Sequence, residues 1–258
     1  MLPTYFIIFV IGLCIGSFID CLVWRLNRKK TILGRSICPQ CKKKIAWYDN
    51  IPLISFIILR GRCRHCKKKI SFQYPLVELA TGILFVIVWL RLNNTSDFVL
   101  QTSYLLLLRD LIFISILIVI FIYDLRWYLI LDIITVPAMA LALVLNFFLG
   151  FNCLNLLIAA AIGGGFFLLQ YVVSRGKWIG GGDIRLGVLM GLMLGYPQII
   201  VALMLAYILG SIVGIMLLAA KKKQWSSQIP FGAFLSAATV VVLLWGEKIL
   251  DWYLGIIF

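Results

Sequence analysis

Charged side chains are scarce in this sequence, and acidic ones are the scarcest. Of the 258 residues only 13% are charged, ten are Asp or Glu and one is His, whereas 63% are hydrophobic and the mean hydropathy is +1.05. A soluble domain of this size needs far more polar surface than that composition supplies. The composition therefore excludes a soluble globule and predicts a polytopic membrane protein.

Lys and Arg are missing from some of the segments between hydrophobic runs and are concentrated in others. No basic residue precedes the first run and residues 93–103 contain none, whereas thirteen of the 24 fall within residues 28–69. Basic loops stay on the cytoplasmic side of a membrane, where anionic lipids also attract them. This pattern predicts an N-terminus outside and the 28–69 stretch inside, and it disfavours nucleic acid as a partner because the charge does not follow one face.

Hydropathy predicts about eight membrane-spanning helices, given that a bilayer core takes about 20 residues to cross. The runs cover residues 3–26, 74–92, 104–123, 132–150, 153–173, 184–196, 198–220 and 229–245, with Lys221-Lys222-Lys223 at the inner face after the seventh. The expected fold is an all-α polytopic membrane protein with one cytoplasmic loop domain. Residues 1–27 form the first transmembrane helix in this division, residues 28–72 the loop domain, and residues 73–258 a seven-helix membrane domain.

The loop contains two Cys-x-x-Cys pairs, which are Cys38 with Cys41 and Cys63 with Cys66. The 21 residues between the pairs are typical of a four-cysteine structural zinc site. In a reducing cytoplasm thiolates bind metal rather than forming disulfides, and four thiolates complete a tetrahedral Zn²⁺ site without an open position. His65 lies between two of the cysteines and is interpreted as a bystander.

Two carboxylates occupy matching places at the predicted cytoplasmic face. Asp124 follows the third hydrophobic run, and Asp183 follows three glycines at the start of the sixth. Ionisable groups at the edge of the hydrocarbon region are costly and usually functional. Such a pair can share one proton and hydrolyse a peptide, can carry protons or cations in a transporter, or can be structural partners of Arg126 and Arg185.

Other acidic residues lie inside the predicted spans. Asp20 is interpreted either as a locally paired carboxylate or as part of a polar cavity, and Glu78 lies close to the inner boundary. Asp110 is expected to be neutralised by the adjacent Arg109, and Asp132 is a further candidate partner at the face of Asp124.

Short motifs along nearly the whole chain resemble those of the type IV prepilin peptidases, also called prepilin leader peptidase/N-methyltransferases, a GxGD-type intramembrane aspartyl protease family. The similar segments are Gly-Ser-Phe at 16–18, Trp-Arg-Leu at 24–26, Cys-Pro-Gln-Cys at 38–41, Ile-Ala-Trp-Tyr-Asp-Asn-Ile-Pro-Leu at 45–53, Leu-Arg-Gly-Arg-Cys at 59–63, Tyr-Pro-Leu-Val-Glu-Leu-Ala-Thr-Gly at 74–82, Gly-Gly-Gly-Asp at 180–183 and Ile-Pro-Phe-Gly at 229–232. Any one of these motifs is weak, but their number and order make the resemblance specific.

The resemblance implies that Asp124 and Asp183 are the catalytic pair. The implied reaction is removal of the basic leader of type IV prepilins or pseudopilins, just after a glycine, at the cytoplasmic face of the bacterial inner membrane. It further implies methylation of the new N-terminus with S-adenosylmethionine, for which no binding residues are assigned and no glycine-rich nucleotide fingerprint is present. The methyltransferase expectation rests on the intact cysteine domain and Glu78, and we expect zinc to fold the loop so that it positions the leader and the methyl donor.

The sequence departs from the family pattern at two positions near the expected site. Leu131 stands where the family often has proline, in Ile130-Leu131-Asp132, so a less rigid turn is expected there. Arg185 replaces the usual lysine two residues after the second aspartate; the charge is retained, but the hydrogen-bond geometry differs.

Overall fold

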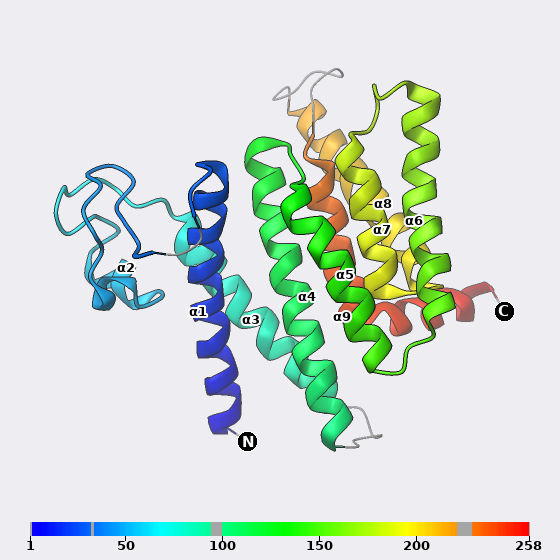
Figure 1. Ribbon diagram of the computed structural model, residues 1–258, viewed down its shortest axis with the longest axis horizontal. Helices are drawn as coiled ribbons and strands as arrows, with labels where there is room; N and C mark the ends of the chain where they lie inside the picture. Colours follow the sequence, from blue (N-terminus) through cyan, green and yellow to red (C-terminus); the bar gives the residue numbers. More distant parts are fainter. Residues whose placement is uncertain (1, 32–33, 94–99, 221–228, 258) are drawn as a thin grey trace. The chain divides into compact units, whose positions relative to one another are not determined.

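The computed structural model describes residues 2–31, 34–93, 100–220 and 229–257, and within these ranges the chain consists of helices with short connections, apart from the longer loop that follows the first helix. The predictions for Lys221-Lys222-Lys223 and for most of the 93–103 stretch concern residues outside the described ranges. Figure 1 shows the course of the chain. The helices are α1 (Leu2–Asn27), α2 (Ile54–Ile58), α3 (Gln73–Asn93), α4 (Leu100–Trp127), α5 (Asp132–Phe148), α6 (Cys153–Ser174), α7 (Gly181–Leu194), α8 (Gln198–Ala219) and α9 (Phe231–Ile257), with a 3-10 helix η1 (Trp47–Asn50).

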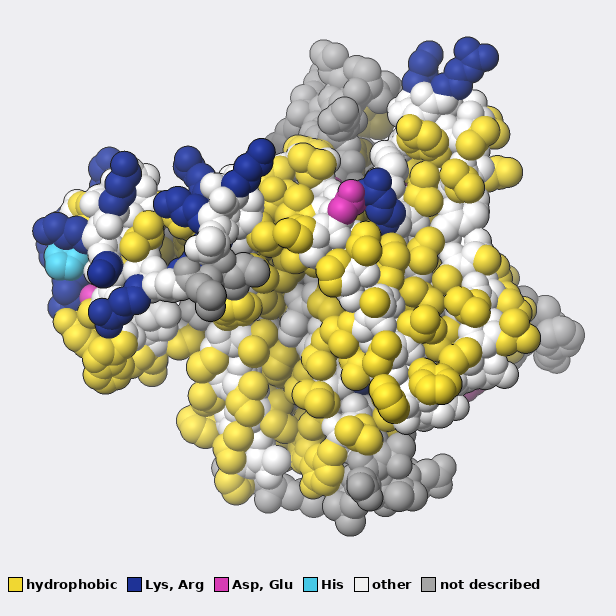
Figure 2. Space-filling model, viewed as in Figure 1, with side chains coloured by type: hydrophobic (Ala, Val, Ile, Leu, Met, Phe, Trp, Pro, Cys, Tyr) yellow, Lys and Arg dark blue, Asp and Glu magenta, His cyan; other side chains and the backbone are white. Residues whose placement is uncertain are grey.

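Six of the described helices are long and apolar enough to cross a membrane, and they lie within α1, α3, α4, α6, α8 and α9. Helix α5 has 17 residues and α7 has 14, which at 1.5 Å per residue is less than the roughly 30 Å of a hydrocarbon core. Hydrophobic side chains cover most of the helical surface in Figure 2, while Lys and Arg gather on the loop and at helix ends. The chain is a multi-pass helical membrane protein.

The chain forms two compact units, residues 1–99 and residues 100–258. In the first unit, α1 packs directly on α3 through glycines that bring the two backbones together. A Cβ atom at Gly12 would lie 2.7 Å from the Cα of Gly82, and one at Gly16 would lie 2.7 Å from the Cα of Glu78. Small residues allow this approach where no hydrophobic drive brings helices together.

In the second unit, α7 is the central helix and packs against α5, α6, α8 and α9. More than half of its side chains are buried, Asp183 and Met190 among them. This explains why the segment is rich in glycine and methionine, since it is surrounded by helices rather than by lipid. Its closest neighbour is α6, because a Cβ at Gly163 would lie 2.3 Å from the carbonyl oxygen of Gly187.

A buried polar cluster fixes the end of α7 opposite Asp183. The Arg109 side chain forms an ion pair of 2.7 Å with Asp110, as expected, and its Nη1 donates to Asn146 Oδ1 at 3.1 Å. Asn146 Nδ2 then donates to the carbonyl oxygen of Leu192 at 2.7 Å. The cluster links α4, α5 and α7, so the position of α7 is defined along its length.

Candidate functional site

Asp124 lies in the last turn of α4, so this helix continues past the predicted end of the span. Its side chain is buried and accepts a hydrogen bond of 2.8 Å from the backbone N–H of Ala233, in the first turn of α9. The backbone of Gly232 also hydrogen-bonds to it. The carboxylate therefore faces the N-terminus of α9, where free N–H groups and the helix dipole favour negative charge.

Asp183 lies in the first turn of α7, at the N-terminus of a second helix. Its Oδ2 accepts a hydrogen bond of 3.0 Å from the backbone N–H of Gly180, and its own N–H donates to the Gly180 carbonyl at 3.1 Å. The side chain is buried, and it is close enough to Asp124 for their charges to interact. The structure thus brings together the two carboxylates that the sequence singled out.

Ile130 connects the segments that carry the two carboxylates. A Cβ at Gly182 would lie 2.9 Å from the Ile130 Cβ, and one at Gly232 would lie 2.9 Å from its Cδ1. The absence of side chains at both glycines lets the α4–α5 connection lie against the starts of α7 and α9. Leu131 adopts φ −85° and ψ 123° and α5 begins at the next residue, so the turn forms without proline.

Neither of the buried carboxylates has an ion-pair partner among the described residues. Arg185 pairs instead with Asp132, and both of those side chains are about half exposed. The Arg126 guanidinium lies over the Trp127 ring, 5.6 Å from its centroid. The alternative of structural pairing with Arg126 or Arg185 is therefore wrong for Asp124 and Asp183.

An aromatic cluster next to Asp183 was not predicted. Tyr207 of α8 is close enough to Asp183 for an electrostatic interaction, and its hydroxyl donates to Gln170 Oε1 at 2.9 Å. The Tyr207 ring packs edge-on against Phe166 and Phe231 at centroid distances of 5.7 and 5.0 Å. In an almost wholly apolar sequence these rings look like any other lipid-facing or core residues, so no sequence signal marks them.

The four cysteines of the loop come together as predicted. Their Sγ atoms all lie within 4.8 Å of one another, and Cys38 and Cys66 are 3.9 Å apart. In a tetrahedron with Zn–S bonds of about 2.3 Å, the sulfurs are about 3.8 Å apart. The cluster fits a metal ion of that size, and His65 is not part of it.

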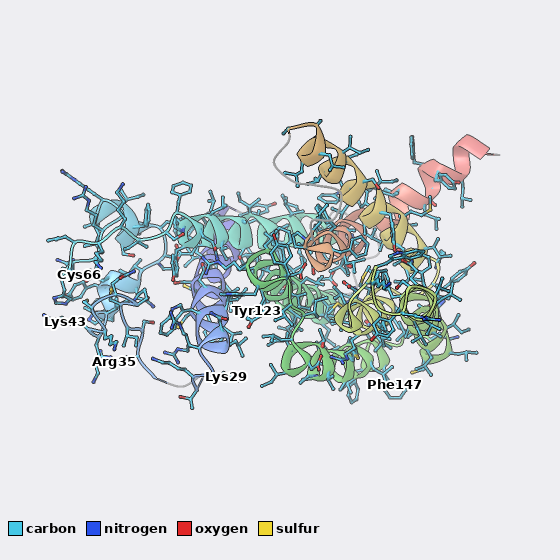
Figure 3. All side chains as sticks on the ribbon, turned by 90° about the horizontal axis from the view of Figure 1, so that it is seen from above. Lys29, Arg35, Lys43, Cys66, Tyr123 and Phe147 are labelled. Carbon is cyan, nitrogen blue, oxygen red and sulfur yellow. The ribbon has the colours of Figure 1, made fainter. Side chains whose placement is uncertain are left out.

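The two halves of the cluster repeat one backbone design. Each half reads Cys-x-x-Cys-Lys-Lys-Lys-Ile, at 38–45 and at 63–70. Isolated antiparallel bridges close both turns, between Ile37 and Lys44 and between Arg62 and Lys69. Lys42 and Lys67 occupy the same left-handed position, with φ of 58° and 56°. Figure 3 labels Lys43 and Cys66 at the end of the loop away from Lys29, which follows α1.

The electrostatics of the thiols also suit a metal. A hydrogen bond from the backbone of Cys66 lowers the pKa of Cys63 to about 7. A backbone hydrogen bond from Lys68 favours the Cys66 thiolate, but burial and contacts with the neighbouring thiols prevail and raise the pKa of Cys66 to about 11. A cation bound by the cluster would therefore stabilise Cys66 as a thiolate.

Asp20 and Glu78 have local partners in the first unit. Gln73 Nε2 donates to Asp20 Oδ1 at 3.2 Å, which favours the interpretation of Asp20 as locally paired. Glu78 is buried against α1 and accepts a hydrogen bond of 2.8 Å from the backbone N–H of Leu53, just before α2. Glu78 therefore anchors the loop to α3.

Replacing Cys38 and Cys41 with serine is expected to remove the bound metal and unfold the loop. Structural zinc sites supply much of the folding free energy of such small domains. Zinc per chain, measured by inductively coupled plasma mass spectrometry, should fall to background, and trypsin should cut within residues 28–72 far faster. The matched control is Cys14→Ser, because Cys14 lies in α1 outside the cluster; zinc retained by the double variant would contradict the assignment.

The fold and the site together define a multi-pass helical membrane protein with a buried carboxylate pair and a four-cysteine cluster that could hold a metal ion. Comparison with known families agrees: the pattern of the bacterial peptidase A24 N-terminal domain matches residues 10–92, and that of the type IV leader peptidase family matches residues 111–215. The chain belongs to the type IV leader peptidase family.

Curated relatives are similar over most of this chain. A prepilin leader peptidase/N-methyltransferase of Myxococcus xanthus is 37% identical over 85% of this chain and 66% of its own length. Proteins of the same name from Aeromonas salmonicida and Legionella pneumophila are 32% and 29% identical, each over 97% of this chain and 94% of its own length. No solved structure matches the chain.

Proposed function

We propose that this protein is a prepilin peptidase that removes the leader of type IV prepilins or pseudopilins, with Asp124 and Asp183 as the catalytic pair. The observation that supports this most is the approach of two buried carboxylates that have no cation partner among the described residues. Burying two such groups together is costly, and a shared proton relieves the cost. This is the arrangement that aspartyl peptidases use.

The hydrogen bonds support different proposed roles for the two groups. Asp124 accepts hydrogen bonds from the backbone of both Ala233 and Gly232, which can stabilise a negative charge on it, whereas among the described residues Asp183 accepts a hydrogen bond from Gly180 only. Asp124 then takes a proton from water as the water oxygen attacks the scissile carbonyl carbon. Asp183 donates its proton to the developing oxyanion, which gives a tetrahedral diol. The Asp124 proton then passes to the leaving amine as the C–N bond breaks, and one diol hydroxyl returns its proton to Asp183 as the new carboxyl group forms.

The glycines before Asp183 leave room for an extended peptide. A Cβ at Gly181 would meet no heavy atom within 4 Å, so there is open space beside this backbone. A prepilin with its apolar helix in the bilayer would present the bond after its leader at this level. The smallest residue, glycine, at the cleavage site would allow the closest approach of the two backbones.

The proposed location is the bacterial inner membrane, with eight spans, the N-terminus outside and the carboxylates facing the cytoplasm. The positive charge of the 28–69 stretch supports this orientation. In this proposal α5 and α7, which are shorter than a hydrocarbon core, would be the other two spans, packed within the bundle of the second unit.

The second proposed activity is methylation of the new N-terminal amine with S-adenosylmethionine. The shared name of the relatives supports it, as does the match of the N-terminal domain to residues 10–92. Zinc at Cys38, Cys41, Cys63 and Cys66 would be structural and would hold the loop in the fold that receives the leader.

One assay tests both activities. Purified protein in detergent is mixed with a prepilin and S-adenosylmethionine, and intact-mass spectrometry follows the prepilin. Loss of the leader and gain of one methyl group are expected. An unchanged prepilin in the presence of zinc-loaded protein would contradict the peptidase, and cleavage without methyl gain would contradict the methyltransferase.

Adding one methyl group at Gly232 should disturb Asp124. A Cβ at this position would lie 3.1 Å from the Asp124 Cγ and Oδ2, so Gly232→Ala is expected to lower the cleavage rate about tenfold. In the control, Gly214→Ala, the new Cβ would make only an ordinary contact of 3.5 Å with Ile229, and the rate should be unchanged. Equal rates for the two variants would show that Asp124 has room to move.

A further inference from the structure

Hydrophobic side chains are gathered on one edge of the loop of the first unit. Ile54, Ile57 and Ile58 of α2 are 55%, 72% and 69% exposed, and Trp47 of η1 and Phe72 just before α3 are 74% and 71% exposed. These five residues are called the α2 patch. Figure 2 shows hydrophobic side chains where Figure 1 places α2, bordered by Lys and Arg.

A hydrogen bond sets the level of this patch along the membrane helices. Leu53, the residue before α2, donates its N–H to Glu78, which lies within the apolar span Gln73–Leu92. Glu78 packs against Gly16 of α1, and Ser17 also hydrogen-bonds to it. Ser17 precedes Arg25 by eight residues, or about 12 Å along a helix. The start of α2 is therefore on the bilayer side of the first basic residue of α1.

Basic residues lie next to the patch on its other side. A cavity of about 440 Å³ is lined by Ile58 together with Arg60, Arg62, Arg64 and Lys67. Arg64 is paired with Asp49, which leaves the cavity with a net positive lining. Apolar side chains next to such a cavity match the boundary between acyl chains and anionic head groups.

We propose that the α2 patch inserts into the cytoplasmic leaflet and that the neighbouring cavity receives the head group of an anionic phospholipid. Trp47 then lies at the level that tryptophan prefers in membranes. The Arg64–Asp49 ion pair holds η1 against the second cysteine pair, so the metal cluster, η1 and α2 are fixed to one another. The loop is thereby a membrane-docked element rather than a free cytoplasmic domain, whether or not the protein cleaves prepilins.

Depth-dependent fluorescence quenching tests the insertion. The experiment uses the zinc-loaded full chain in which Cys14, Cys21 and Cys153 are changed to alanine. A bimane fluorophore is attached at Ile57→Cys. In the control it is attached at Lys43→Cys, an exposed position in the turn of the first cysteine pair. In nanodiscs with phosphatidylglycerol, a nitroxide on a shallow acyl carbon should quench the label at 57 about threefold more than the label at 43.

Each other outcome overturns the proposal. Equal lipid quenching at 57 and 43 would mean that the patch is not inserted. A label at 57 that is shielded from aqueous iodide but not quenched by lipid would mean that protein covers the patch. Quenching at 57 that is the same in discs of phosphatidylcholine alone would contradict the anionic head group. No prepilin is present in these measurements, so they are independent of the proposed peptidase.

Discussion

Asp124→Asn and Asp183→Asn are each expected to lower the rate of leader removal by about 10³-fold or more. Asparagine keeps the size of the side chain and can still accept from Ala233 or Gly180. It cannot exchange a proton with water or with the substrate near neutral pH, so hydrolysis loses either its base or its acid. The rate is measured from the conversion of a purified prepilin by mass spectrometry.

The matched control for these variants is Asp132→Asn. Asp132 is also a carboxylate close to a helix start, but it is 57% exposed and is paired with Arg185. Exposed ion pairs contribute little, so this variant should keep nearly full activity. If either Asp124→Asn or Asp183→Asn cleaved as well as Asp132→Asn, the catalytic pair would be refuted. Near-identical helicity and detergent-gel behaviour of all three variants would confirm that they remain folded.

Gly163→Ala is expected to destabilise the second unit by about 2 kcal/mol or more. The new Cβ would lie 2.3 Å from the backbone oxygen of Gly187, so α6 and α7 would have to move apart. Because α7 carries Asp183 in its first turn, leader removal should slow as well. Thermal unfolding followed by circular dichroism in detergent measures the loss of stability.

Gly165→Ala on the same helix is the control for this packing effect. A Cβ at Gly165 would meet nothing within 4 Å, so the variant should unfold at the same temperature or slightly higher, since alanine favours helix by roughly 0.5 to 1 kcal/mol over glycine. A Gly163→Ala variant as stable as Gly165→Ala would show that the α6–α7 contact is not tight.

The sequence contained enough to pair Asp124 with Asp183, because basic residues defined the faces and each carboxylate stood at the end of an apolar run. The sequence did not reveal which groups hold the two carboxylates in place. The donors to Asp124 are backbone N–H groups of Gly232 and Ala233, about a hundred residues away in the chain. Nearly every residue type has a backbone N–H, so the sequence does not show which residues act as backbone donors. Tyr207 was missed for a related reason, since its polar end is unusual only beside Asp183.

The membrane helices and the cysteine cluster were predictable because both follow from short, strong patterns. The apolar runs predicted all of the long helices, and the spacing of the cysteines predicted that Cys38 and Cys66 would meet. The five-residue α2 was not predicted, because its first residue follows Leu53, whose φ of 59° is unusual for a branched apolar residue. The N–H of Leu53 is bonded to Glu78, which lies 25 residues further along the chain.

Among the described residues, the hydrogen bonds to both carboxylates of the site come from main-chain amides at the starts of α7 and α9. Replacing the side chains of the second unit with alanine, its glycines excepted, would therefore leave these bonds in place and would miss the groups that orient the pair. Only a proline, which has no N–H, can delete one of them, at Ala233 or at Gly180. We therefore expect such a site to tolerate many substitutions of the surrounding side chains, provided that the glycines at its helix starts are kept.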